Sequence, residues 1–211
     1  MIISPFFHTN GNDKFGGKGM KTLIILSHPD PNSFNHAIVK RVIHKLETKQ
    51  HEIRVRDLYE MNFQPILKED CFTTGYSTQI PSSVREEQEH IKWANQLLFV
   101  FPTWWGGMPA ILKGYIDRVF SNGFAFKFKD DSSEGLLNDK KAIIFQTTSH
   151  PEESLKPYQI ISSIETIIDV GILKFCGIET IAHKFFYSVP YVDHDSRNRM
   201  LKEVEDIVEM L

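Results

Sequence analysis

Three short, unbroken apolar segments constrain the fold of this chain more than any other feature of its sequence. They read TLIIL at 22–26, LLFVF at 97–101 and AIIFQ at 142–146. Apolar runs of this length indicate strands that are buried on both faces. Such strands belong to parallel sheets that are covered by helices on each side, so an α/β fold is expected.

The segments between these strands have the period of amphipathic helices. Apolar residues recur three or four positions apart over 39–46, 112–119, 160–168 and 201–211, and a charged amphipathic stretch lies at 83–95. Two weaker strands are predicted at 51–57 and 178–188. Alternating strands and helices with right-handed crossovers predict three layers, with a five-stranded parallel sheet in the order 2-1-3-4-5 and helices on both faces.

Length and charge limit the domain organisation and the class of partner. The 211 residues fit one domain, which we expect over 20–211. Residues 1–19 lack a signal-peptide pattern and are interpreted as a disordered or artificially added extension. No apolar run is long enough for membrane insertion, and a formal net charge of -3 gives no reason to expect nucleic acid as a partner. Cys71 and Cys176 match no metal spacing and are typical of reduced thiols, which favours a cytoplasmic protein.

In an open parallel sheet, ligands bind beyond the carboxyl ends of the strands, where the strand order reverses. This rule selects the loops after the first, third and fourth strands. In the first loop, SHPDPNSFNH, either Asn32 or Ser33 can cap the next helix. The amides of Ser33, Phe34 and Asn35 would then form an anion site, which His28 could also reach. Ordinary capping beside a surface histidine is the alternative.

The second loop, PTWWGGMP, is suited to a planar ring. Trp104 and Trp105 are costly to leave in water, and Gly106 and Gly107 remove side chains where a ligand would come close. Core packing of one tryptophan and a dimer contact of the other remain an alternative.

The third loop, TTSHP, offers hydroxyl groups and backbone amides to a ring edge. His150 could donate a proton near neutral pH, although a loop histidine is commonly a plain surface residue. Neither a G-x-G-x-x-G nor a P-loop pattern follows a strand, and no metal-binding motif is found. Glu86, Glu87 and Glu89 are expected on a solvated helix face.

Five sequence blocks, in order, resemble the NAD(P)H:quinone oxidoreductase family of flavodoxin-like proteins. They are HPDPNSFNHA, DLYEMNFQPI, FPTWWGGMPAILKGYIDRVF, TTSH and GILKFCG. The resemblance runs from about Lys21 to about Arg199, and the PAILKGYIDRVF stretch is its most specific part. It implies a flavodoxin-like fold, a homodimer with flavin sites at the interface, and a small quinone-like acceptor.

The resemblance also assigns flavin-binding residues. The phosphate and ribityl loop is matched by His28, Ser33, Phe34 and Asn35, the loop along the isoalloxazine by Pro102, Thr103, Trp104, Trp105 and Gly106, and the pyrimidine side by Thr147 and Thr148. The implied reaction is a two-electron, ping-pong hydride transfer from NAD(P)H through FMN, with FAD a close second. The alternative is a flavin-binding ancillary subunit of a membrane potassium-efflux system.

The chain departs from the family pattern in the third loop. The family commonly has two glycines after the paired threonines, where this chain has Ser149 and His150. The Tyr–His pair of the animal enzymes has no clean counterpart. Tyr158 falls near the position of that histidine and His150 is the alternative, so these two residues are the candidate catalytic groups.

Overall fold

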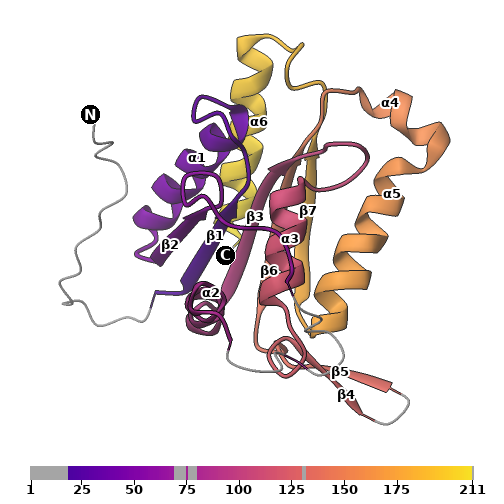
Figure 1. Cartoon of the computed structure of the whole chain (residues 1–211). Coiled ribbons are helices and arrows are strands. Elements are labelled where there is room, and N and C mark those ends of the chain that lie inside the picture. Colours follow the sequence, from indigo (N-terminus) through magenta and orange to yellow (C-terminus); the bar gives the residue numbers. More distant parts are fainter. Residues whose placement is uncertain (1–18, 69–74, 76–79, 130–131, 211) are drawn as a thin grey trace.

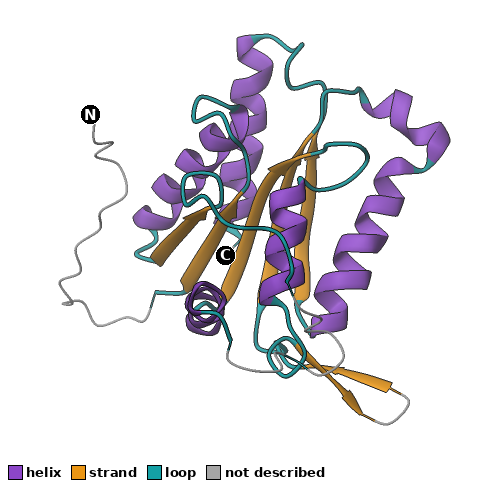
Figure 2. Ribbon diagram, viewed as in Figure 1, coloured by secondary structure: helices purple, strands orange, loops and turns teal. Residues whose placement is uncertain are grey.

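The computed structural model describes residues 19–68, 75, 80–129 and 132–210. Apart from Gly19, the extension expected over 1–19 lies outside the described residues, and so does Cys71. The chain forms a central sheet between two layers of helices (Figures 1 and 2). The strands are β1 (Lys21–Leu26), β2 (Glu52–Asp57), β3 (Gln96–Pro102), β4 (Phe126–Lys129), β5 (Ser132–Gly135), β6 (Lys141–Thr147) and β7 (Glu179–Phe186).

Helices connect the strands of the central sheet, as its parallel pairing requires. One layer contains α1 and α6, which contact each other, and the other contains α2, α3 and α5 (Figure 1). The helices are α1 (Phe34–Thr48), α2 (Ser82–Trp93), α3 (Ala110–Val119), α4 (Glu152–Leu155), η1 (Lys156–Tyr158), α5 (Ile160–Glu165), η2 (Thr166–Leu173), η3 (Lys174–Cys176) and α6 (His194–Glu209). Among the described residues, none of these helices combines the length and apolar character needed to cross a bilayer.

The central sheet is parallel and has the order β2-β1-β3-β6-β7. The predicted α/β class, with five parallel strands and helices on both faces, is confirmed. The predicted order 2-1-3-4-5 is wrong, because the fourth and fifth strands of the chain are not in this sheet. β4 and β5 pair with each other as a separate antiparallel hairpin. Their sequences, FKFK and SSEG, are short and polar, so no buried-strand pattern revealed them.

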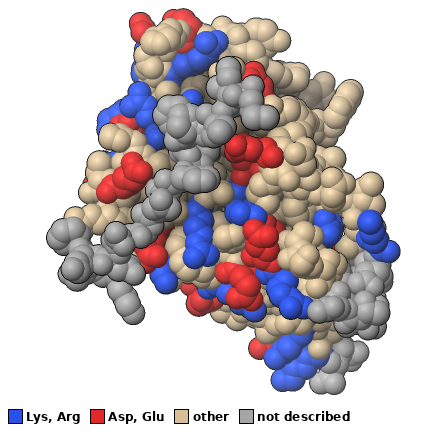
Figure 3. Space-filling view, turned by 60° about the vertical axis from the view of Figure 1, so that its left-hand side comes forward, with Lys and Arg blue, Asp and Glu red and all other residues tan. Residues whose placement is uncertain are grey.

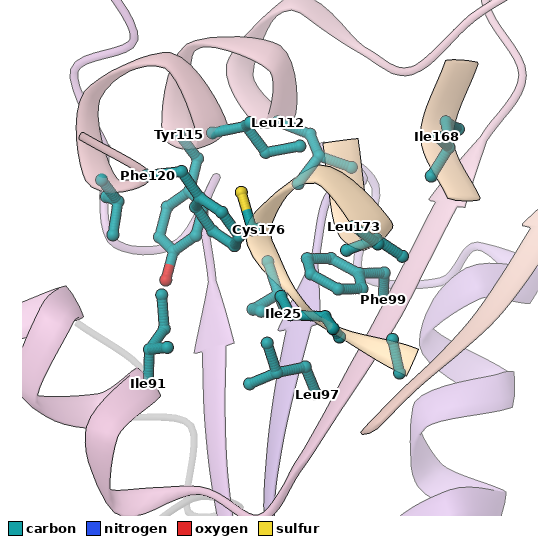
Figure 4. Packing of buried hydrophobic residues seen from close by; sticks show 14 of the residues in the cluster. Ile25, Ile91, Leu97, Phe99, Leu112, Tyr115, Phe120, Ile168, Leu173 and Cys176 are labelled. Carbon is teal, nitrogen blue, oxygen red and sulfur yellow. The ribbon is translucent and has the colours of Figure 1, made fainter. Parts of the chain in front are cut away.

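Alternate residues of β1, β3 and β6 enter two separate cores. In β1, Leu23 and Ile25 face the core under α2, α3 and α5, whereas Ile24 and Leu26 face the core under α1 and α6. All four side chains are fully buried. Figure 4 shows Ile25 within the first core, packed among residues from several elements. Burying a side chain of this size contributes about 1.5–3 kcal/mol, which explains the unbroken apolar run at 23–26 of β1.

Glu87 corrects the expectation of a solvated acidic face on α2. Its side chain is buried and accepts hydrogen bonds from Arg56 Nε at 3.0 Å and from the Tyr115 hydroxyl at 3.3 Å. Burial raises the pKa of Glu87, and the neighbouring guanidinium opposes that shift. Acidic and basic side chains are otherwise interleaved on the face shown in Figure 3. The helical period places Glu87 on the same face as Val84 and Ile91, but its partners cannot be inferred from that period.

The pairing of the strands brings three predicted loops to one edge of the sheet. Leu26 pairs with Val100, and Pro102 pairs with Thr147, so β1, β3 and β6 end side by side. The amide of Thr103 then donates to the carbonyl of Thr147 at 2.6 Å, which joins the second and third loops directly.

Candidate functional site

A cleft of about 640 Å³ lies at the carboxyl edge of the sheet. Its volume is within the usual range for small-molecule and cofactor sites. The walls come from the loops after β1, β3 and β6 and from the start of α6. The predicted residues that line it are His28, Ser33, Phe34, Asn35, Pro102, Thr103, Trp104, Thr147 and Thr148.

The first loop presents the N-terminus of α1 to this cleft. Ser33 is the N-cap, with extended backbone angles, and its hydroxyl accepts from the amide of His36. Asp30 shapes the loop, because its side chain accepts from the amide of Asn32 and its carbonyl from the amide of Ser33. Amides in the first helical turn have no acceptor within the helix, so the cleft offers donors at the positive end of the helix dipole.

The Ser33 side chain is fixed by a short hydrogen-bonded series that the sequence did not reveal. Ser33 Oγ lies 3.0 Å from Nδ1 of His36, and Nε2 of His36 lies 3.1 Å from Oδ2 of Asp57. Asp57 ends β2 and is buried together with His36. The capping hydroxyl is therefore held by groups from two elements.

His28 lies in the first loop and lines the cleft, where its neutral ring can donate a hydrogen bond. The amide of Asp30 donates to Nδ1 of His28, so the ring proton is on Nε2 in the neutral form. Burial lowers the pKa of His28 below its ordinary value, and the nearby carboxylates of Asp30 and Asp57 oppose the shift only in part. The neutral form of the ring is therefore favoured.

The tryptophans of the second loop take separate positions. Trp104 and Gly107 exchange backbone hydrogen bonds around a tight turn, whose two central residues have positive φ, 51° at Trp105 and 73° at Gly106. Trp104 lines the cleft, whereas Trp105 is fully exposed. A positive φ is strained for a bulky residue. The strained turn therefore directs the indole of Trp105 outward, away from the core.

The third loop is tied to the first by a buried contact. Nδ2 of Asn35 donates to the hydroxyl of Thr147 at 3.0 Å, and both side chains are buried. The amide of Thr148 donates to the carbonyl of Phe186 in β7. Ser149, which departs from the family pattern, lines the cleft. The paired threonines are thus held in place from both neighbouring sides.

The structure does not bring every predicted residue to the cleft. Among the described residues, Trp105, Gly106, His150 and Tyr158 are not part of its lining. Tyr158 is about three-quarters exposed, and His150 is exposed with its ring against the hydroxyl of Ser149. The catalytic roles expected for His150 and Tyr158 stay predictions.

The start of α6 forms a further wall of the cleft, and the sequence had suggested Arg197 there only as a residue that could reach a diphosphate. Arg197 lines the cleft, and its Nε donates to the carbonyl of Val189 at 3.2 Å. Asp193 caps α6 and accepts from the amide of Ser196 at 2.7 Å. A capping aspartate a few residues before an arginine marks a helix start in sequence, but not which cleft that start would face.

Comparison with known proteins agrees with this geometry. A family model described as "Flavodoxin-like fold" matches residues 20–209. An uncharacterized NAD(P)H oxidoreductase of Haemophilus influenzae is 35% identical over 184 residues, which cover 87% of this chain and 91% of that protein. NAD(P)H dehydrogenase (quinone) 1 of Cavia porcellus is 30% identical over 211 residues, covering 89% of this chain and 77% of that protein.

The chain belongs to the NAD(P)H:quinone oxidoreductase family of flavodoxin-like proteins. It is therefore an oxidoreductase. The solved structures agree, since the NAD(P)H:quinone oxidoreductase from Methanothermobacter marburgensis superposes with a TM-score of 0.82 at 27% identity, covering 90% of this chain and 98% of that one. The resemblance inferred from the five sequence blocks is confirmed.

Proposed function

We propose that this protein is a flavin-dependent NAD(P)H oxidoreductase that reduces quinones or similar small acceptors by two-electron hydride transfer. Residues 20–211 would form the single flavin-binding domain. The observation that carries the proposal is the cleft itself, where a helix N-terminus, a tryptophan and paired threonines meet at the carboxyl edge of the sheet. Relatives named NAD(P)H dehydrogenase (quinone) support the same class of donor and acceptor.

The residues present fit the phosphate of a flavin. The first turn of α1 supplies backbone donors, and Ser33 and His28 add side-chain groups. Arg197 lies in the same cleft and brings a full positive charge. A helix N-terminus and a guanidinium are both suited to a phosphate dianion.

The remaining walls fit the rest of the cofactor. Trp104 offers an aromatic face, and Pro102, Thr103, Thr147 and Thr148 offer backbone and hydroxyl groups. A flavin bound there would accept a hydride from NAD(P)H and pass it to an acceptor. This chain's residues would hold the ring, keep water from one of its faces and leave the other open to the donor and the acceptor in turn, which gives ping-pong kinetics.

FMN is the cofactor that the charges of the cleft favour. A second phosphate, as in FAD, would need its own donors, and another helix start that borders the cleft is that of α6. The carboxylate of Asp193 already accepts from that turn, and its hydrogen bond to Ser196 lowers the pKa of Asp193 so that it stays ionised. A second anion at that turn would meet the carboxylate of Asp193, because the guanidinium of Arg197 is already assigned to the first phosphate.

Exposed apolar side chains support a homodimer. Trp105, Phe128 and Ile167 are more than half exposed. Exposed aromatic and aliphatic groups of this size are typical of interfaces between protein chains. A second copy covering them would complete the open side of each cleft in a cytoplasmic dimer. Nothing in the described residues favours the alternative of an ancillary subunit of a potassium-efflux system.

Titration with three flavins tests the proposal. We expect FMN to bind one per chain with a dissociation constant of about 1 μM or lower, FAD more weakly, and riboflavin more weakly still because it lacks the phosphate. Quenching of flavin fluorescence measures all three, and light scattering on the same sample should give twice the mass of the chain. Equal, millimolar affinities for the three flavins would contradict the assignment of the cleft.

A further inference from the structure

A hydrogen-bonded series of four side chains links a second cavity to the lining of the cleft. Asp169 Oδ1 lies 3.0 Å from Nδ1 of His183, and Nε2 of His183 lies 3.1 Å from Oε1 of Gln146. Nε2 of Gln146 donates to Oγ1 of Thr103 at 2.7 Å. The four residues come from η2, β7, β6 and the loop after β3, so the fold rather than the local sequence brings them together.

The series begins at a second cavity and ends in the cleft. Asp169 and His183 line a cavity of about 750 Å³ beside η2, whereas Thr103 lines the cleft. Gln146 is fully buried between them, and the His183 side chain is 3% exposed. Figure 4 shows Ile168 and Leu173 of η2 directed into the core, which anchors the turn that carries Asp169.

With the amide of Gln146 oriented as in the structure, the contacts match the doubly protonated form of His183. Both of its ring nitrogens face oxygen acceptors, so each nitrogen must carry a proton, and the carboxylate of Asp169 balances the charge. Gln146 then accepts through its carbonyl and donates through its amide group to Thr103. Because the Thr103 oxygen accepts this bond, its own proton is free to be donated into the cleft.

When His183 loses one proton, the donors and acceptors along the series exchange roles. With His183 neutral and Nδ1 still donating to Asp169, Nε2 becomes an acceptor. Two acceptors cannot face each other at 3.1 Å, so the amide of Gln146 must turn over and donate to Nε2. Its carbonyl then accepts the proton of Thr103, and the hydroxyl offers only lone pairs to the cleft.

We propose that Asp169, His183 and Gln146 are positioning residues that set whether the Thr103 hydroxyl donates to, or accepts from, the group held in the cleft. The proposal rests on the flavin site proposed above. With both ring nitrogens of His183 protonated, Thr103 donates and favours negative charge on that group. With His183 neutral, the preference reverses. The other ionisable groups around the cavity beside His183 are Glu165, Lys174 and Glu179.

The first test uses no flavin. In protein labelled with 15N-histidine, the signals of His183 at pH 6.5 should show a proton on both ring nitrogens. Asp169→Asn keeps the shape of the partner but removes its charge, so the Nε2 signal should move to that of an unprotonated nitrogen. Glu179→Gln, which removes a charge from the same cavity, should leave the signals unchanged. A His183 that is neutral in the unsubstituted protein, or that does not respond to Asp169→Asn, would overturn the proposal.

The second test measures whether Asp169 acts through Thr103. Thr103→Val and Asp169→Asn should each raise the dissociation constant for fully reduced FMN at pH 6.5 about three- to tenfold, the range expected for one hydrogen bond. The double variant should bind reduced FMN no more weakly than the weaker-binding single variant. Thr103→Ser keeps the hydroxyl and should have the dissociation constant of the parent. Effects that multiply in the double variant would show independent roles and refute the series. If neither the parent nor any variant binds FMN, the proposed function is wrong. The histidine signals still test the hydrogen-bonded series in that case.

Discussion

Replacing Arg197 with glutamine is expected to raise the dissociation constant for FMN about 10- to 100-fold and that for riboflavin less than about twofold. The guanidinium lies in the cleft together with the N-terminus of α1, and a hydrogen bond to a charged group is worth about 1.5–3 kcal/mol. Riboflavin has no phosphate, so its affinity should not depend on this guanidinium. Fluorescence titration of both flavins against both proteins gives the comparison.

Arg199 provides a matched control on the same helix. Its guanidinium donates to the hydroxyl of Ser196, and it is not among the residues that line the cleft. Arg199→Gln therefore removes an equal charge from α6 without touching the site, and both affinities should stay within about twofold of the parent. An equal loss for FMN and riboflavin in Arg197→Gln would instead indicate that the variant has disturbed the loop through Val189, not the phosphate contact.

Gly114→Ala is expected to destabilise the protein by about 1–3 kcal/mol, although alanine is the better helix former. A Cβ atom at this position of α3 would lie 2.3 Å from the carbonyl oxygen of Pro65 and 2.6 Å from its Cα. Backbone atoms cannot rotate away as a side chain could, so the segment after β2 must move off α3. Chemical denaturation of the two proteins measures the difference.

Gly171→Ala is the control for this effect. The nearest atom to a Cβ there is the Thr166 carbonyl oxygen at 3.7 Å, an ordinary contact distance. The same change of side chain in η2 should therefore leave the free energy of unfolding unchanged or raise it by about 0.5–1 kcal/mol. If both variants lost the same stability, the close approach of α3 to Pro65 would not be the cause.

The central elements were predictable because their sequences carry strong periodic signals. β1, β3 and β6 are buried on both faces, so their apolar runs are nearly unbroken, and α1, α3 and α6 are amphipathic. The hairpin β4–β5 was missed because β4 alternates over only four residues and β5 is polar and does not alternate. It lies outside the central sheet, where burial would have imposed a pattern.

The parts of the candidate site that local sequence places were predictable. Ser33 caps α1 as a residue of its type commonly does, and the end of β6 places Thr147 beside the end of β3. Arg197 and His183 reach their positions through α6 and β7, which are distant in sequence from those loops. Only the packed fold shows that Arg197 borders the cleft and that His183 is linked to it through Gln146.

Anaerobic reduction of the FMN-loaded protein tests the central claim most directly. On mixing with NADH or NADPH in a stopped-flow spectrophotometer, the visible absorption of the bound flavin should bleach. Addition of benzoquinone after the pyridine nucleotide is exhausted should restore it, with one quinone reduced per flavin. A bound flavin that neither nucleotide reduces, or whose reduced form does not react with quinone, would contradict the assignment of this cleft to NAD(P)H-dependent quinone reduction.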